Sequence, residues 1–150
     1  MKRCEYFGSE QGSSLVETAL VLPLLLTVMF GIAESGRVML SYSALADAAR
    51  AGTRYAIVHG TNRIGSGVDG PSGPGNTSNV DSAAKTITRA AALPDANVTV
   101  TVAYPNGNSV GAPVTVTVSY PFNFVLPVAV PFHLLPTITL GSTSQGMICF

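Results

Sequence analysis

The feature that most constrains the fold is a long helical pattern near the N-terminus, whose first part is apolar. Residues 18–33 include no charged side chain. A helix needs about 20 apolar residues to cross the ~30 Å hydrocarbon core of a bilayer, and residues 15–33 approach that length. Pro23 does not exclude a span, because helices in lipid tolerate proline. The pattern therefore predicts a transmembrane helix at about residues 15–33.

Basic residues near the span predict its orientation. Lys2 and Arg3 precede it, and only Arg37 follows it closely. Because basic residues favour the cytoplasmic side of a membrane, we expect a single pass with the N-terminus in the cytoplasm.

The helical pattern continues well beyond the span. Apolar and small residues recur every three or four positions, as one face of a helix requires; they are Val38, Tyr42, Leu45, Ala49, Gly52 and Ala56. Glu34–Arg37 has the i,i+3 spacing of an ion pair. A helix from about Ser14 to Val58 is ~65 Å long, so its second half must lie outside the membrane. Its small residues permit close packing on its own domain, on another helix, or on both.

Residues 59–150 are expected to form one small extracytoplasmic domain. A glycine- and proline-rich loop at 61–79 leads to a short helix at 80–93, which Pro94 ends. Apolar residues then alternate with Thr and Ser at 98–104 and 114–120, which predicts an antiparallel hairpin. Further strands are expected at 137–140 and near 147–148. The predicted fold is α+β: a long N-terminal helix packed against a small antiparallel sheet.

From Ala96 to Phe150 the chain has no Asp, Glu, Lys or Arg. Within this region, the segment 121–136 is apolar but contains four prolines, so it cannot be a spanning helix. Two interpretations remain open for it. It either fills the core of the domain, or it is an exposed patch that docks on a partner subunit or on the membrane surface.

Several function classes find no support in the residues. The net charge is zero, so we expect no nucleic-acid partner. The two histidines, His59 and His133, and the two cysteines, Cys4 and Cys149, form no metal-binding spacing, and no serine lies in a nucleophile motif. We therefore expect no enzyme activity, no catalytic residue, no metal and no small-molecule cofactor.

Glu17 is the unusual residue of the apolar segment. A carboxylate at mid-membrane costs about 2.5–3.5 kcal/mol, and less near the edge, where the side chain can reach the interface. If the chain is cut after Gly12, however, the new amine of Ser13 lies one helical turn from Glu17. In a packed filament that pair would neutralise both charges and set the register of neighbouring subunits.

Two stretches carry a resemblance to a known family. Gly12 to Glu17, followed by the apolar run, resembles the processing site of type IV pilin-like proteins. More narrowly, residues 12–58 resemble the TadE-like minor pilins, or pseudopilins, of tight-adherence (Flp-type) pili; the matching parts are residues 16–23 and 48–56. Major pilins of these systems have tyrosine after the glutamate. The chain has Thr18 there, which favours an accessory subunit.

The resemblance implies a type IV pilin-like fold and a specific processing route. A prepilin peptidase would cut between Gly12 and Ser13, removing a leader of residues 1–12 and leaving a helix of residues 13–58. Glu17 would act in assembly. The implied partners are other pilin or pseudopilin subunits and the pilus assembly platform. The implied location is the bacterial inner membrane, with the C-terminal domain in the periplasm and incorporation into an extracellular pilus.

One rival interpretation stays open. Lys2 and Arg3, the apolar run and Gly31-Ile32-Ala33 before Glu34 also resemble an ordinary signal peptide. The protein would then be a periplasmic or secreted binding module, either released from a signal peptide or held by a simple membrane anchor. Glu17 within the apolar run argues against this alternative.

Overall fold

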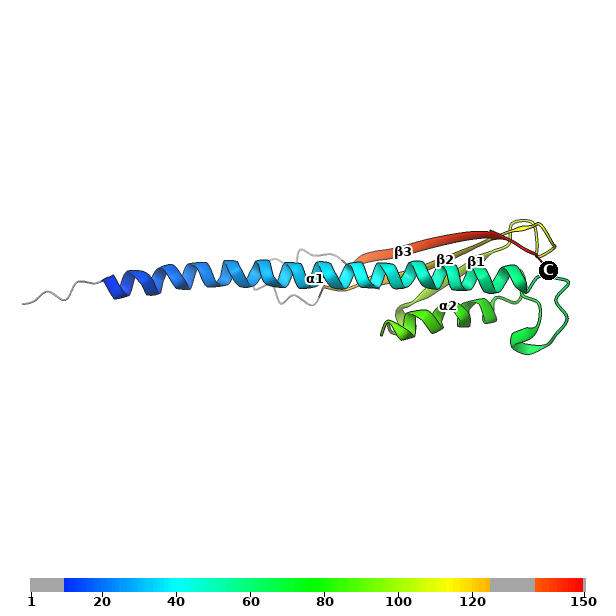
Figure 1. The fold of residues 1–150 in the computed structure, drawn as a ribbon, viewed down its shortest axis with the longest axis horizontal. Helices are drawn as coiled ribbons and strands as arrows, with labels where there is room; N and C mark the ends of the chain where they lie inside the picture. Colours follow the sequence, from blue (N-terminus) through cyan, green and yellow to red (C-terminus); the bar gives the residue numbers. More distant parts are fainter. Residues whose placement is uncertain (1–9, 125–136, 150) are drawn as a thin grey trace, which may run out of the picture.

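The dominant element is one helix that runs the length of the molecule. The structure is a computed structural model that describes residues 10–124 and 137–149. Helix α1 (Glu10–Val58) has 49 residues, which corresponds to ~73 Å, and the other elements lie beside its C-terminal half (Figure 1). The helix ends at Val58, as predicted. It begins at Glu10, before Gly12, because residues 10–14 contain no proline and only one glycine to oppose a helix.

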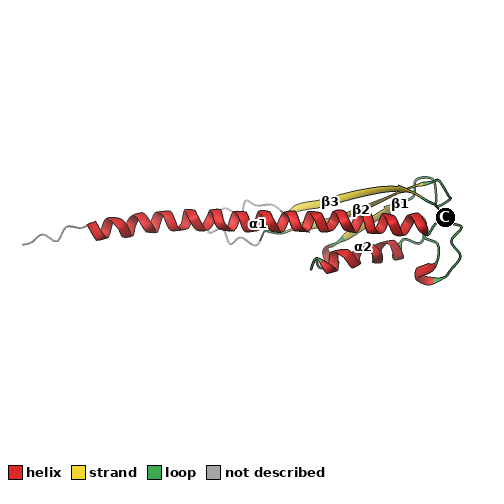
Figure 2. Cartoon of the chain, in the orientation of Figure 1, coloured by secondary structure: helices red, strands yellow, loops and turns green. Residues whose placement is uncertain are grey.

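Three antiparallel strands form one sheet in the order β1-β2-β3 (Figure 2). They are β1 (Thr99–Ala103), β2 (Pro113–Phe122) and β3 (Ile138–Met147). Strands β1 and β2 form the predicted hairpin, with Val100 opposite Val118 and Val102 opposite Val116. This alternation puts the valines of both strands on the face toward α1.

Strand β3 differs from the expectation of two short strands at 137–140 and 147–148. It is a single strand whose ten residues all pair with β2. Residues 141–146 include two glycines and two serines, which have weak strand propensity. They are held by tertiary contacts: a Cβ at Gly146 would lie 3.0 Å from both Ile57 Cδ1 and Thr53 Cγ2. Thr53 Oγ1 also donates a hydrogen bond to the carbonyl of Ser144 at 3.3 Å.

Helix α2 (Ser78–Ala90) lies two to three residues nearer the N-terminus than the predicted 80–93. It ends before Pro94, because Ala92 adopts a left-handed backbone with φ of 58°. The N–H of Leu93 then donates to the carbonyl of Thr88 at 2.9 Å, as in the motif that usually ends helices with glycine. Two short 3-10 helices, η1 (Gly67–Asp69) and η2 (Asp95–Asn97), lie in the loops.

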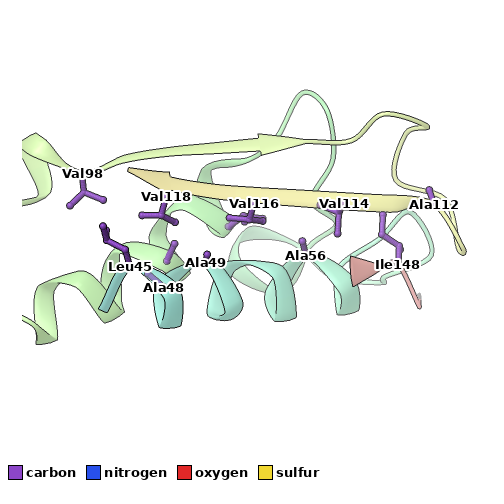
Figure 3. Packing of buried hydrophobic residues seen from close by; sticks show 12 residues of the cluster. Leu45, Ala48, Ala49, Ala56, Val98, Ala112, Val114, Val116, Val118 and Ile148 are labelled. Carbon is purple, nitrogen blue, oxygen red and sulfur yellow. The ribbon is translucent and has the colours of Figure 1, made fainter. Parts of the chain in front are cut away.

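The core lies where the C-terminal half of α1 meets the sheet and α2 (Figure 3). Its fully buried side chains include Leu45 of α1, Val116 of β2 and Val80 of α2. Gly52 lies at the meeting point, where a Cβ would be 3.1 Å from Val116 Cγ1 and 3.5 Å from Ala84 Cβ. The α+β fold, with a long helix packed on a small antiparallel sheet, is therefore confirmed.

Candidate functional site

The N-terminal half of α1 projects beyond the domain, and we treat it as the candidate site (Figure 1). Every side chain from Leu15 to Ala33 is exposed, except for the half-buried Gly31. The most apolar 18-residue window of this helix has a mean hydropathy of 2.2, and none of it is buried. By length and composition this is a helix that can cross a membrane, as the sequence predicted. Its apolar surface has no cover among the described residues.

Three hydroxyl groups in and just beyond this apolar segment donate hydrogen bonds within the helix itself. Thr18 donates to the carbonyl of Ser14 at 2.9 Å, Thr27 to that of Pro23 at 2.8 Å, and Ser35 to that of Gly31 at 2.8 Å. In hydrocarbon an unpaired hydroxyl is costly. These bonds therefore let Thr18 and Thr27 occupy the span, and Ser35 lie just beyond it, with their hydroxyl groups bonded within the helix.

The predicted processing site lies on the first turns of α1. Gly12 and Ser13 are both exposed, and a Cβ at Gly12 would meet nothing within 4 Å. No described residue outside the helix covers the bond between them. Ser13 precedes Glu17 by four residues, so the helix places both on one side, about 6 Å apart along the axis.

Glu17 differs from the other polar residues of the segment. Its side chain is exposed and lines a shallow groove on one side of the helix, together with Ser14, Thr18, Val21, Leu22 and Leu25. Within residues 10–124 and 137–149, its carboxylate has neither a hydrogen-bond nor an ion-pair partner. A carboxylate in an apolar setting requires one. Among the described residues, Glu17 is thus a carboxylate without a partner on the most apolar surface of the helix.

A second carboxylate, that of Glu34, lies just after the apolar segment of the helix and is paired with Arg37. Glu34 is only 8% exposed and accepts two hydrogen bonds from Arg37 Nη1, at 2.7 and 2.9 Å, as its i,i+3 spacing predicted. The guanidinium carbon of Arg37 lies 5.2 Å from the centre of the Phe122 ring. That cation–π contact, which no sequence pattern signalled, joins the end of β2 to α1.

A buried polar network, which sequence reasoning missed, joins the far end of α1 to the glycine-rich loop. Ser72, 1% exposed, donates to the carbonyl of His59 at 3.1 Å and accepts a bond from Tyr104 Oη at 3.1 Å. The rings of Tyr55 and His59 stack with centres 3.9 Å apart, and Tyr55 Oη donates to the carbonyl of Val68.

The pKa values of both tyrosines in this network are raised. Burial raises the pKa of Tyr104, and the hydrogen bond to Ser72 offsets part of that rise. Burial, and then the charge of Asp69, raise the pKa of Tyr55. Among the described residues, no three His, Cys, Asp or Glu side chains are placed to hold a metal ion. The network holds the glycine-rich loop against the C-terminal end of α1.

Some residues singled out from the sequence lie outside the described ones. These are Lys2, Arg3, Cys4, residues 125–136 of the proline-rich segment, and with them His133. The choice between a core-filling and a docking segment therefore stays a prediction for these residues. Cys149 is described; it is an exposed free thiol.

Comparison with known proteins bears on the same helix. The family model described as TadE-like protein matches residues 12–54, which begins at Gly12, includes Glu17 and ends inside α1. The resemblance predicted from the sequence is therefore confirmed for this segment, and the sheet and α2 lie beyond the match. No match was found among curated proteins or among solved structures.

Proposed function

We propose that this TadE-like chain is a minor pilin, or pseudopilin, that takes part in assembling a tight-adherence (Flp-type) pilus. The N-terminal half of α1 holds the precursor in the bacterial inner membrane, with the C-terminal domain in the periplasm. A prepilin peptidase cuts between Gly12 and Ser13. The mature subunit then joins other pilin or pseudopilin subunits at the assembly platform and enters the pilus.

One observation carries this proposal. The segment that matches the TadE-like family, residues 12–54, includes an exposed apolar surface with a single carboxylate, Glu17, that lacks a partner among the described residues. A permanent anchor gains nothing from such a charge, which costs free energy in lipid. A subunit that must leave the membrane and join other helices is stabilised there, because the amine of a partner subunit can form an ion pair with Glu17.

The amine produced by cleavage is the partner that the geometry offers. Within one chain, Ser13 and Glu17 have i,i+4 spacing, which is worth only a few tenths of a kcal/mol on an exposed helix. Between chains, the same two charges would meet in a dry helix bundle. Breaking such a buried pair by removing one member costs about 3–5 kcal/mol, so the contact would fix the axial position of each incoming subunit.

Substitution of Glu17 by alanine tests this role. Glu17→Ala should leave membrane insertion and cleavage intact but remove the subunit from sheared pili, because the incoming amine finds no carboxylate. Thr18→Ala is the matched control: its position is adjacent, also exposed and in the same groove, and its hydroxyl donates to the carbonyl of Ser14 in the same helix. Immunoblots of membrane and pilus fractions provide the measurement.

Normal incorporation of the Glu17→Ala subunit into pili would remove the proposed role of this residue. Loss of incorporation in both variants would assign the effect to altered helix packing instead of to the charge.

A further inference from the structure

One end of the sheet lies at the level where α1 leaves its apolar segment. Phe122 of β2 is the partner of Ile138 of β3, and its ring lies over Arg37 of α1. Phe124 packs edge-on against Phe122, with ring centres 5.3 Å apart and planes at 79°. Phe122, Phe124 and Ile138 are hereafter called the proximal end of the domain.

The rise of the helix places the proximal end relative to a bilayer. Arg37 follows Ala33, the last residue of the apolar segment, by four residues, or about 6 Å along the axis. The interfacial layer on each side of the ~30 Å hydrocarbon core is roughly 5–7 Å thick. If residues 15–33 fill the core, then the side chains that contact Arg37 lie at the level of the lipid headgroups.

The chemistry of the proximal end suits that layer. Ile138 is 46% exposed and Phe124 is half-buried, so these two side chains form the accessible surface. Phe122, only 2% exposed, supports them from below. Strands β2 and β3 contain no charged residue. The charges described at this level, Glu34 and Arg37, are paired with each other at 2.7 Å. Among the described residues, no unpaired charge therefore lies at the proximal end, where it would oppose contact with acyl chains.

Helix continuity and the size of the patch favour lipid over a second copy of the chain. Helix α1 is unbroken from the apolar segment into the domain, so no linker separates the proximal end from the membrane surface. By themselves, the three described side chains cannot supply the roughly 1,200–2,000 Å² that a stable protein–protein interface buries in total. A lipid surface, by contrast, is already present at that height.

From this geometry we infer that the proximal end is a lipid-contact surface, through which the domain rests on the periplasmic leaflet while the precursor is held in the membrane. The inference depends on the membrane insertion in the proposed function, but not on cleavage or on Glu17. The domain is then held at two places, by the span and by the proximal end, and leaving the membrane breaks both contacts together.

The chain contains no tryptophan, so single tryptophans can report on lipid contact. Ile138→Trp reports on the proximal end and Phe30→Trp on the span. Val110→Trp is the matched control: Val110 is 53% exposed and adjoins Gly111, whose N–H bonds to Ile148 at the opposite end of the sheet. Each full-length variant is reconstituted into phosphatidylethanolamine–phosphatidylglycerol vesicles, with and without acyl chains brominated near the headgroup.

We expect bromination to quench the emission of Phe30→Trp and of Ile138→Trp, and to leave that of Val110→Trp unchanged. The emission of Phe124→Trp, which replaces one aromatic ring by another at the same end, should be quenched too. This variant replaces Ile138→Trp in the experiment if Ile138→Trp alters the circular dichroism. Quenching at Phe30 but not at the proximal end would overturn this inference alone. An unquenched Phe30→Trp would overturn membrane insertion itself. A blue-shifted but unquenched Ile138→Trp would assign the surface to a second copy.

Discussion

At the scale of single residues, Glu17 and Glu34 of helix α1 have opposite surroundings. Glu34 is buried and bonded to Arg37, whereas Glu17 is exposed and has no partner among the described residues. They lie 17 positions apart, or about 26 Å along the axis. Among the described residues, the chain therefore pairs Glu34 and leaves Glu17 without a partner; the proposed function assigns that partner to a neighbouring subunit.

Tyr104 supports a prediction about alkaline pH. Burial raises the pKa of its phenol, so the folded protein holds this proton more tightly than the unfolded chain, whose tyrosine titrates near pH 10. The resulting stability is fully present below that pH and is lost as pH rises through the folded-state value. In urea unfolding of the detergent-solubilised chain, Tyr104→Phe should lessen the fall in stability above pH 10.

The same variant should also lose about 1 kcal/mol at neutral pH, because the buried hydroxyl of Ser72 loses a hydrogen bond. An unchanged slope above pH 10, together with that neutral loss, would show that Tyr104 contributes its hydrogen bond but not its titration.

Contacts between individual side chains were the least predictable feature from the sequence. The ion pair of Glu34 with Arg37 follows from spacing on one helix. The position of Arg37 over Phe122 depends on where a strand 85 residues later in the chain ends, which no local pattern encodes. Likewise the left-handed Ala92 was not foreseeable, because glycine usually occupies that position at the end of a helix.

At the scale of elements, the C-terminal half of α1 has two faces with opposite surroundings. Leu45 is fully buried in the core, whereas Leu40, little more than one turn earlier, is 72% exposed. Leu45→Ala should therefore lower the free energy of unfolding by about 2–5 kcal/mol, through lost burial and the cavity left behind. Leu40→Ala should change it by no more than about 0.5 kcal/mol.

Urea unfolding of the full chain in detergent, followed by circular dichroism, measures both variants. Equal losses of stability for the two would contradict the assignment of one face of α1 to the core. If Leu40→Ala also incorporates poorly into pili while folding normally, the exposed face of the helix contacts another subunit.

Elements in which apolar residues recur at a regular spacing were predictable from the sequence, and elements without such a pattern were not. Helix α1 and the β1–β2 hairpin follow from regular recurrence of apolar residues. The middle of β3 lacks such a signal, since Gly141 and Gly146 flank a run of small polar residues. Its continuity comes from pairing with β2 and from the close approach of α1 at Gly146, which are tertiary effects.

At the scale of the whole molecule, a single continuous helix connects the apolar segment to the domain without a linker. If α1 is drawn out of a membrane, as the proposed function requires, the force acts directly on the domain through the core around Leu45. The described molecule is long and narrow (Figure 1), with a helix that extends far beyond its domain. This shape suits a subunit whose exposed helix is finally covered by other helices.

The central claim is that the chain is processed as a prepilin, and the N-terminal residue of the protein purified from membranes tests it most directly. Sequencing or mass spectrometry of that terminus should identify Ser13. Gly12→Val should abolish this product, whereas Gly36→Val, at another exposed helical glycine with open space around it, should not. A wild-type chain that begins at Glu34, as an ordinary signal peptide would leave it, or that retains Met1, as a simple anchor would, contradicts the claim.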